Sequence, residues 1–184
     1  MSPCTKYFTQ PVQLAEYRSP IGTMTLAACQ DGLCGAWFAG QNYFPALPAE
    51  LLESPQTAGH LEAACRWLDR YFAGQFSALP DLPALVPFGS PFRQLIWRLL
   101  RTVPCGHTTT YGALAVRAAR LTGRAHLSAQ AVGGAVGHNP LSLFIPCHRV
   151  VGADGSLTGY AGGLERKRWL LRREGALTDN PPPF

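Results

Sequence analysis

The hydrophobic pattern near the start of the chain has the period of two that is typical of strands. Apolar side chains at 24, 26 and 28 alternate with Thr23, Thr25 and Ala27, and Asp31-Gly32 then marks a turn. Residues 33–39 continue as a second strand. The N-terminal half is therefore predicted to contain a small antiparallel sheet.

The pattern then changes to a helical period. Residues 61–72 carry their apolar side chains at helical spacing, and Gly74 follows as a stop signal. This amphipathic helix is predicted to cover the sheet. Residues 77–90 contain three prolines and Gly89, which oppose both helix and central strand. We place a domain boundary in this linker, which gives domains of residues 1–87 and 88–184.

A helix follows the linker, with Ser90 as its cap and Pro91 in its first turn. Two short helices separated by a turn are predicted after it. The first begins at Thr110-Tyr111, runs towards Arg120 and ends at Gly123. The second covers residues 129–137, contains only small side chains and Gln130, and has Ser128 as its cap. This pair is typical of a helix-turn-helix that lies in a nucleic-acid groove. Close helix packing inside a core explains the same small residues.

In the last part of the chain, Cys147 is predicted to lie in a turn. Residues 141–145 form a brief apolar run before Pro146-Cys147-His148-Arg149. Residues 150–151 and 157–160 flank a hairpin-like turn, and a final helix is predicted over 164–174. The elements together predict an α/β (α+β) chain of two domains, in which the C-terminal domain is mostly helical.

Charge divides the chain in the same way. Residues 1–87 hold four Lys/Arg and seven Asp/Glu, whereas residues 88–184 hold twelve and four, for net charges of −3 and +8. A basic half suits a polyanionic partner, although a solubilising surface explains it equally well. We find no signal peptide and no apolar run that could span a bilayer, which leads us to expect a cytoplasmic protein without membrane contact. The six cysteines form no C-x-x-C pair and are expected to be reduced thiols.

Cys147 is the candidate nucleophile. A thiol reacts as its thiolate, which needs a nearby base or positive charge, and His148 and Arg149 follow directly. Neighbouring side chains on an extended segment point to opposite sides, so the imidazole is expected to act through a bridging water. A buried, inert thiol explains the same residues without chemistry.

A family resemblance extends these observations. The segment PCHRVVG, preceded by TYGALA and AVGGAVGHNP and followed by GYAGGLERKRWLLRREG, closely resembles the O6-alkylguanine-DNA alkyltransferases, or methylated-DNA–protein-cysteine methyltransferases. The match covers about residues 90–176, and a weaker one includes Ser19-Pro20-Ile21-Gly22. The resemblance implies a ribonuclease H-like N-terminal domain and a winged-helix-like C-terminal domain.

The resemblance also implies an activity. Such a protein binds the minor groove of double-stranded DNA, flips an alkylated guanine out of the stack, and transfers the alkyl group irreversibly to Cys147. It performs one turnover as a monomer without a cofactor, and O4-alkylthymine is a second expected lesion.

The family's roles carry over by position. Cys147 is the acceptor, His148 takes its proton through water, Glu174 orients the imidazole, and Asn139 fixes the turn. Tyr111 contacts the flipped base and turns the target phosphate, while backbone groups of Cys147, Val150 and Ala161 read the guanine edge. The remaining predicted DNA or base contacts are Ala131, Gly133, Arg149 and Tyr160.

The sequence departs from the family at two places. Gln130 stands where some members have an arginine finger, and glutamine lacks the charge and planar fork of donors of arginine. The link between the two short helices, residues 116–127, is longer and carries Arg117, Arg120 and Arg124 as candidate phosphate contacts. Some relatives bind zinc through an N-terminal site, but Cys4, Cys29 and Cys34 lack a fourth ligand near 88–92, so we predict no metal.

Three other functions compete with repair. A DNA-binding regulator would use the same helix-turn-helix, and an alkyltransferase-like protein would bind lesions without repair, although such proteins replace the nucleophile that Cys147 provides here. A Cys-His hydrolase lacks a recognisable oxyanion-hole motif or a third orienting residue of the protease kind.

Overall fold

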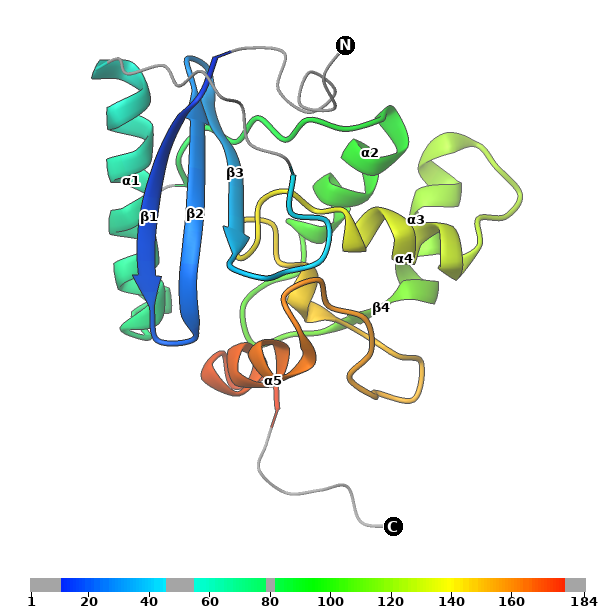
Figure 1. Cartoon of the computed structure of the whole chain (residues 1–184). Helices are drawn as coiled ribbons and strands as arrows, with labels where there is room; N and C mark the ends of the chain where they lie inside the picture. Colours follow the sequence, from blue (N-terminus) through cyan, green and yellow to red (C-terminus); the bar gives the residue numbers. More distant parts are fainter. Residues whose placement is uncertain (1–10, 46–54, 79–81, 178–184) are drawn as a thin grey trace.

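The computed structural model shows a sheet and a helix on one side and a group of short helices on the other (Figure 1). Strands β1 (Gln13–Ser19), β2 (Gly22–Cys29) and β3 (Gly32–Phe38) form an antiparallel sheet in the order β1-β2-β3. The predicted pair is therefore confirmed, and β1 is an additional strand. The structure describes residues 11–45, 55–78 and 82–177.

An irregularity in β3 decides which side chains face the core. The register shifts between Ala27 and Ala28, which pair with Gly35 and Leu33, so Cys34 is the extra residue of a bulge. Leu33 and Ala36 thereby join the main core cluster, whereas Cys34 and Trp37 belong to a second cluster on the other face.

Helix α1 (Pro55–Phe72) covers the main face of the sheet, as the helical spacing predicted. It begins six residues before the predicted start at Leu61, because the first turns carry little apolar periodicity. A short 3-10 helix, η2 (Phe76–Ala78), follows it. The apolar stripe of α1 is buried against β1, β2 and β3.

The outer edge of β3 is paired with two segments from elsewhere in the chain. Leu33 N donates to Ala84 O at 2.7 Å and Val86 N donates to Leu33 O at 2.8 Å, so the linker lies along this edge. Further along, Ala36 N donates to Pro140 O at 2.8 Å and Ser142 N to Ala36 O at 2.9 Å. The sheet thus holds the segment that leads to Cys147 through main-chain hydrogen bonds.

Three helices form the helical side of the molecule, α2 (Pro91–Leu100), α3 (Tyr111–Thr122) and α4 (Ala129–Gly137). Their N-caps are the predicted Ser90 and Ser128, together with Thr110, whose side chains accept from backbone N–H groups of the first turn. Helix α4 packs on both α2 and α3, as expected for a helix-turn-helix.

The link between α3 and α4 is shorter than predicted. Residues 116–122 are helical, and Gly123 ends α3 in the left-handed conformation with φ +64°. The predicted helix end at Gly123 is confirmed, and the prediction of a link that starts at residue 116 is wrong because residues 116–122 belong to α3. Arg120 and Arg124 are exposed, while Arg117 donates to the Thr102 hydroxyl at 3.0 Å.

A short parallel pair replaces the predicted hairpin. Strand β4 (Thr109–Thr110) pairs with β5 (Val150–Val151), whereas residues 157–160 form no strand. The turn itself is present, since Gly152 N donates to Ser156 O at 2.9 Å. This pairing places the start of α3 next to the 3-10 helix η3 (Cys147–Arg149), which directly precedes β5.

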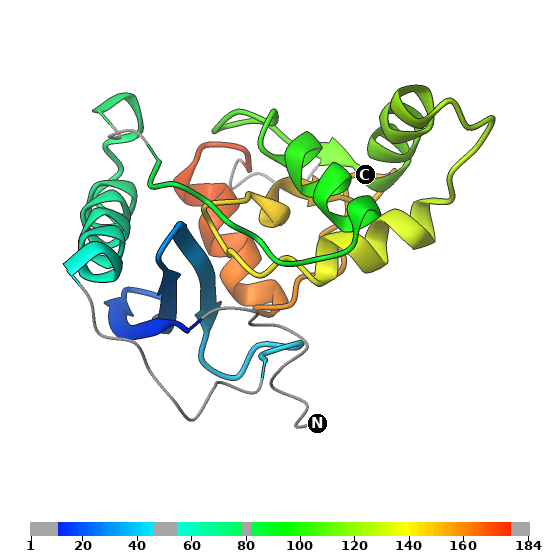
Figure 2. The same ribbon diagram turned by 90° about the horizontal axis from the view of Figure 1, so that it is seen from above.

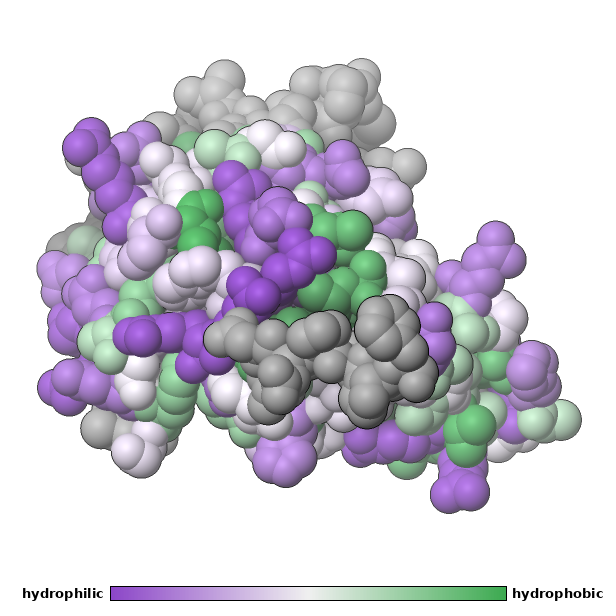
Figure 3. All heavy atoms as spheres, turned by 90° about the horizontal axis from the view of Figure 1, so that it is seen from below, coloured by the Kyte–Doolittle hydropathy of each residue, from purple (hydrophilic) through white to green (hydrophobic). Residues whose placement is uncertain are grey.

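The final helix, α5 (Leu164–Arg173), lies between the two sides of the molecule when seen from above (Figure 2). From below, hydrophilic residues spread over much of the visible surface (Figure 3). Within the residues that the structure describes, no helix is long and apolar enough to cross a membrane.

The N-terminal cysteines bond within the sheet. The Cys29 and Cys34 thiols are buried and donate to backbone carbonyls of Gly32 and Ala27 at 3.5 and 3.3 Å. Among residues 11–45, 55–78 and 82–177, no group of three or more His, Cys, Asp or Glu side chains is arranged to hold a metal ion. Cys4 lies outside these residues.

Two glycines provide a matched test of this packing. A Cβ on Gly35 would overlap the Trp37 ring. A Cβ on Gly59, at an exposed position of α1, would meet nothing within 4 Å. We expect Gly35→Ala to lower the free energy of unfolding by about 1–3 kcal/mol. Gly59→Ala should raise it by roughly 0.5–1 kcal/mol through helix propensity. Urea unfolding measures both, and a stable Gly35→Ala variant would contradict the ring position.

Candidate active site

Cys147 is the first residue of η3, and its turn is fixed by one buried side chain. Asn139, just after α4, donates from Nδ2 to Ile145 O at 2.8 Å and to Cys147 Sγ at 3.0 Å. Its Oδ1 accepts from Leu141 N at 3.0 Å. One amide therefore bonds both the backbone before the cysteine and the sulfur itself.

The Cys147 thiol is only 4% exposed, which bears directly on its protonation state. Burial raises the pKa of Cys147, while the Asn139 hydrogen bond, the nearby Lys167 ammonium and backbone hydrogen bonds lower it. The resting sulfur is consequently a protonated thiol in a site with groups that favour the thiolate. Its reaction needs a base that removes the proton.

His148, which directly follows Cys147 in the chain, is fully buried and bonds to the predicted carboxylate. Its Nε2 lies 2.8 Å from Glu174 Oε1. Burial lowers the pKa of His148, so the imidazole is neutral near pH 7. Because an ionised carboxylate requires the hydrogen on Nε2, Nδ1 carries the lone pair, and Nδ1 has no hydrogen-bond partner among the described residues.

Glu174 caps the end of α5 and, besides the His148 bond, accepts hydrogen bonds from Tyr71 and Arg149. Tyr71 Oη donates to Oε1 at 2.6 Å, Arg149 Nη2 donates to Oε1 at 2.9 Å, and Arg149 Nε donates to Oε2 at 2.8 Å. Burial raises the pKa of the Glu174 carboxyl, but its bonds to His148 and Arg149 outweigh burial and hold the pKa well below its usual range. Since the imidazole is neutral, the guanidinium is the charge that keeps Glu174 ionised.

Arg149 therefore faces inward. Its Nη1 also donates to Val103 O at 2.6 Å, and its side chain is 11% exposed. This placement joins Arg149 to Glu174 and gives no support to the predicted DNA contact. A guanidinium with its planar fork of donors suits this carboxylate geometry.

Lys167 is a site residue that the sequence analysis did not single out. The side chain is fully buried in α5, and Nζ donates to Val150 O and Thr158 O. Burial lowers the pKa of Lys167 to about 8. A signal existed, because residue 167 lies on the apolar stripe of the last helix, three and four residues before Leu170 and Leu171.

A pocket of about 500 Å³, in the size range of small-molecule sites, lies next to the loop that contains Thr158, Tyr160 and Ala161. Cys147 does not line it, but its sulfur acts electrostatically on Tyr111 and Tyr160, which do. The pocket walls come from the loop after β3, the start of α3, α4 and residues 158–161, and include Asn42, Tyr43, Tyr111, Gln130, Gly133 and Tyr160. The Tyr111 hydroxyl donates to Thr158 O at 3.2 Å and Gly159 O at 3.1 Å.

The predicted contact residues fall into two groups. Gln130, Gly133, Tyr160 and Ala161 line the pocket together with Tyr111. The others lie elsewhere: Val150 is fully buried in β5, and Ala131 is exposed on α4, where its N–H donates to the Ser128 cap at 3.1 Å.

Tyr71, Asn42 and Tyr43 are the residues that sequence reasoning missed in the N-terminal half. Tyr71 appeared only as part of an apolar stripe, and nothing in its spacing distinguishes a tyrosine that bonds a carboxylate 103 residues away. Asn42 and Tyr43 lie in a loop without periodicity. Only the folded chain brings these residues to the site.

Comparison with known proteins agrees with this geometry. The family model described as "6-O-methylguanine DNA methyltransferase, DNA binding domain" matches residues 91–176. The model described as "6-O-methylguanine DNA methyltransferase, ribonuclease-like domain" matches residues 13–84.

Similar proteins carry the name of the predicted activity. A methylated-DNA–protein-cysteine methyltransferase of Shigella flexneri is 49% identical over 110 residues, 60% of this chain but only 61% of that protein's length. One from Mycolicibacterium paratuberculosis is 42% identical over 165 residues, 88% of this chain and 93% of that protein.

A solved structure extends the similarity to the fold. The crystal structure of Mycobacterium tuberculosis OGT in complex with DNA superposes with a TM-score of 0.73 at 38% identity, and the match covers 90% of this chain and 94% of that one. The predicted two-part fold and family resemblance are thus confirmed. The chain belongs to the 6-O-methylguanine DNA methyltransferase family.

Proposed function

We propose that this chain repairs DNA by irreversible transfer of an alkyl group from guanine O6 to Cys147. The observation that carries the proposal is the buried Cys147, whose sulfur accepts from Asn139 and which directly precedes a neutral imidazole that a buried carboxylate orients. The names of the relatives support it. A buried, inert cysteine would not require the Asn139 bond to sulfur or the ionised Glu174.

The proposed reaction is a displacement at the alkyl carbon. The Cys147 proton passes through a bridging water to His148 Nδ1, and Glu174 stabilises the charge that forms on the imidazole. The thiolate attacks the alkyl carbon, the S–C bond forms and the C–O6 bond breaks, so the electron pair of that bond stays on guanine. Guanine recovers a ring proton, which balances the proton that left the thiol. The thioether is stable, so each molecule reacts once.

Access to O6 requires that the base leaves the stack, because O6 lies in the major groove of a paired duplex. We propose that α4 binds the minor groove and that Gln130 at its first turn fills the vacated position. Tyr111, at the start of α3, turns the target phosphate and contacts the flipped base. The exposed Arg120 and Arg124 are candidate phosphate contacts.

The remaining expectations stay predictions. They are the domain boundary near residue 87, a cytoplasmic location, a monomer, the absence of a bound metal, and activity on O4-alkylthymine. The same holds for the backbone groups of Cys147, Val150 and Ala161 that would read the guanine edge.

A labelling experiment tests the proposed activity. Duplex DNA with radiolabelled methyl at guanine O6 is incubated with the protein, and the label is located by peptide mapping. We expect one label per molecule on Cys147, and none in Cys147→Ala, which should still bind the duplex. Binding without transfer by the unchanged protein would favour a regulator instead.

The rate of alkyl transfer should fall at acidic pH, when His148 becomes protonated. Burial lowers the pKa of His148 from 6.5, so the imidazole needs a lower pH to become protonated and stop accepting a proton. Single-turnover rates from about pH 7.5 to about pH 5 should therefore stay level down to pH 6.5 and fall only below it. Circular dichroism at each pH controls for unfolding. A midpoint above 6.5 would contradict a neutral, buried base.

Gln130 offers a test of the DNA step. Gln130→Arg adds a positive charge and a planar fork of donors at an exposed position of the pocket wall. We expect roughly tenfold tighter DNA binding, about 1.4 kcal/mol, measured by fluorescence anisotropy at fixed salt. Gln130→Ala, which removes the side-chain amide, should instead weaken DNA binding. Unchanged affinity and unchanged transfer rate in both variants would remove Gln130 from the DNA interface.

A further inference from the structure

The loop after β3 is attached to the C-terminal half at consecutive residues. The buried Gln41 Oε1 accepts from Phe38 N at 2.8 Å and from the Ser142 hydroxyl at 3.3 Å. Asn42 N donates to Ala161 O at 2.9 Å. These bonds fix the loop both to the segment before Cys147 and to the loop that lines the pocket.

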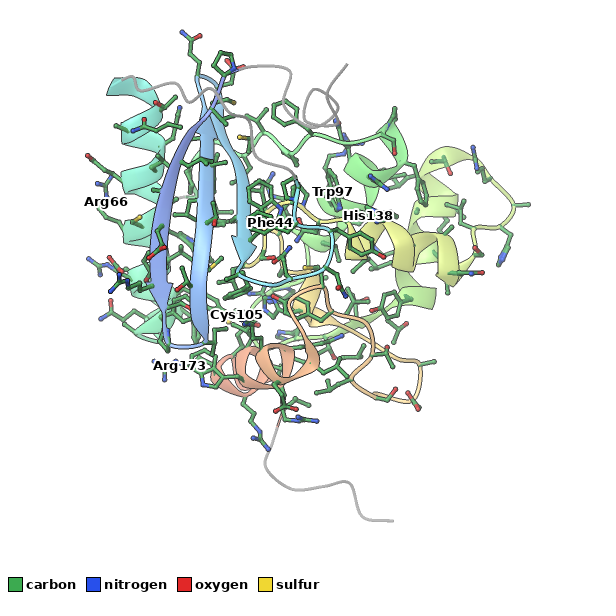
Figure 4. All side chains as sticks on the ribbon, in the orientation of Figure 1. Phe44, Arg66, Trp97, Cys105, His138 and Arg173 are labelled. Carbon is green, nitrogen blue, oxygen red and sulfur yellow. The ribbon has the colours of Figure 1, made fainter. Side chains whose placement is uncertain are left out.

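Tyr43 follows directly and is held in an unusual state. Its φ is +61°, a left-handed conformation that costs a non-glycine residue roughly 1–2 kcal/mol. Tyr43 is nevertheless 60% exposed, and its ring stacks on the His138 imidazole, with centroids 4.0 Å apart and planes at 27°. Figure 4 labels His138 at the end of α4, near the labelled Phe44 of this loop. A strained, exposed aromatic residue that burial does not explain indicates a binding role.

Tyr43 forms part of the pocket wall. Tyr43 and Asn42 line the pocket together with Tyr111 and Tyr160. Burial raises the pKa of both pocket tyrosines, the bond to Thr158 lowers that of Tyr111, and the Cys147 sulfur raises both. A base that enters this pocket therefore meets the Tyr43 side chain on the same walls as Tyr111 and Tyr160.

We propose that Tyr43 is a specificity-determining residue of the N-terminal half, whose ring contacts the O6 substituent and favours aromatic over methyl adducts. The inference rests on the proposed alkyl transfer. An aromatic substituent offers the ring a large apolar and π surface, whereas a methyl group offers little. Aromatic pairs contribute enough to change a rate ratio about threefold to tenfold.

The choice of variant follows from the backbone. Asparagine tolerates the left-handed conformation better than most residues, so Tyr43→Asn removes the ring and keeps the loop. Tyr43→Phe keeps the ring. Phe44→Ala is the matched control. Phe44 is the adjacent aromatic residue, is 37% exposed and does not line the pocket. Its ring packs on Trp37, with ring centroids 5.7 Å apart.

The measurement is the ratio of single-turnover rates on duplex DNA that contains O6-benzylguanine or O6-methylguanine. Tyr43→Asn should lower the benzyl-to-methyl ratio about threefold to tenfold, with Tyr43→Phe and Phe44→Ala within about twofold of the unchanged protein. An unchanged ratio, or equal slowing on both substrates, would overturn the inference and make Tyr43 a support for α4. If the unchanged protein transferred an alkyl group from neither substrate, the proposed function itself would be refuted.

Discussion

The buried carboxylate of Glu174 is the interaction on which the site depends. Its side chain is fully buried and ionised, which would be costly without partners. Arg149 supplies the opposing charge, Tyr71 a hydroxyl from α1, and His148 an N–H. One group therefore joins the helix of the N-terminal half, the last helix and the active-site turn, and it also sets the tautomer of the base.

A second constraint comes from the edge of the sheet. An unpaired strand edge needs hydrogen-bond partners, and β3 finds them in the linker and in the segment at Pro140 and Ser142. Asn139, which bonds the Cys147 sulfur, directly precedes that segment. The sheet thus fixes the segment that leads to Cys147 through main-chain hydrogen bonds.

Burial gives the site its chemistry as well as its rigidity. It raises the pKa of the Cys147 thiol and lowers that of His148, so the proton stays on sulfur until a substrate arrives. Lys167 adds a buried positive charge nearby, and it bonds the carbonyls of Val150 and Thr158. The resting thiol is accordingly protonated, and its reaction depends on a base that removes the proton.

The sequence alone determined the elements with strong local signals: the capped helices, the paired strands 23–28 and 33–39, and Cys147 in its motif. The end of α3 at Gly123 was also readable from the sequence, whereas local signals failed where β5 paired with β4 rather than with residues 157–160. Only the tertiary structure decided that Tyr71, Lys167 and Tyr43 belong to the site. Their contacts are long-range, and no spacing along the chain records which distant surface a side chain will meet.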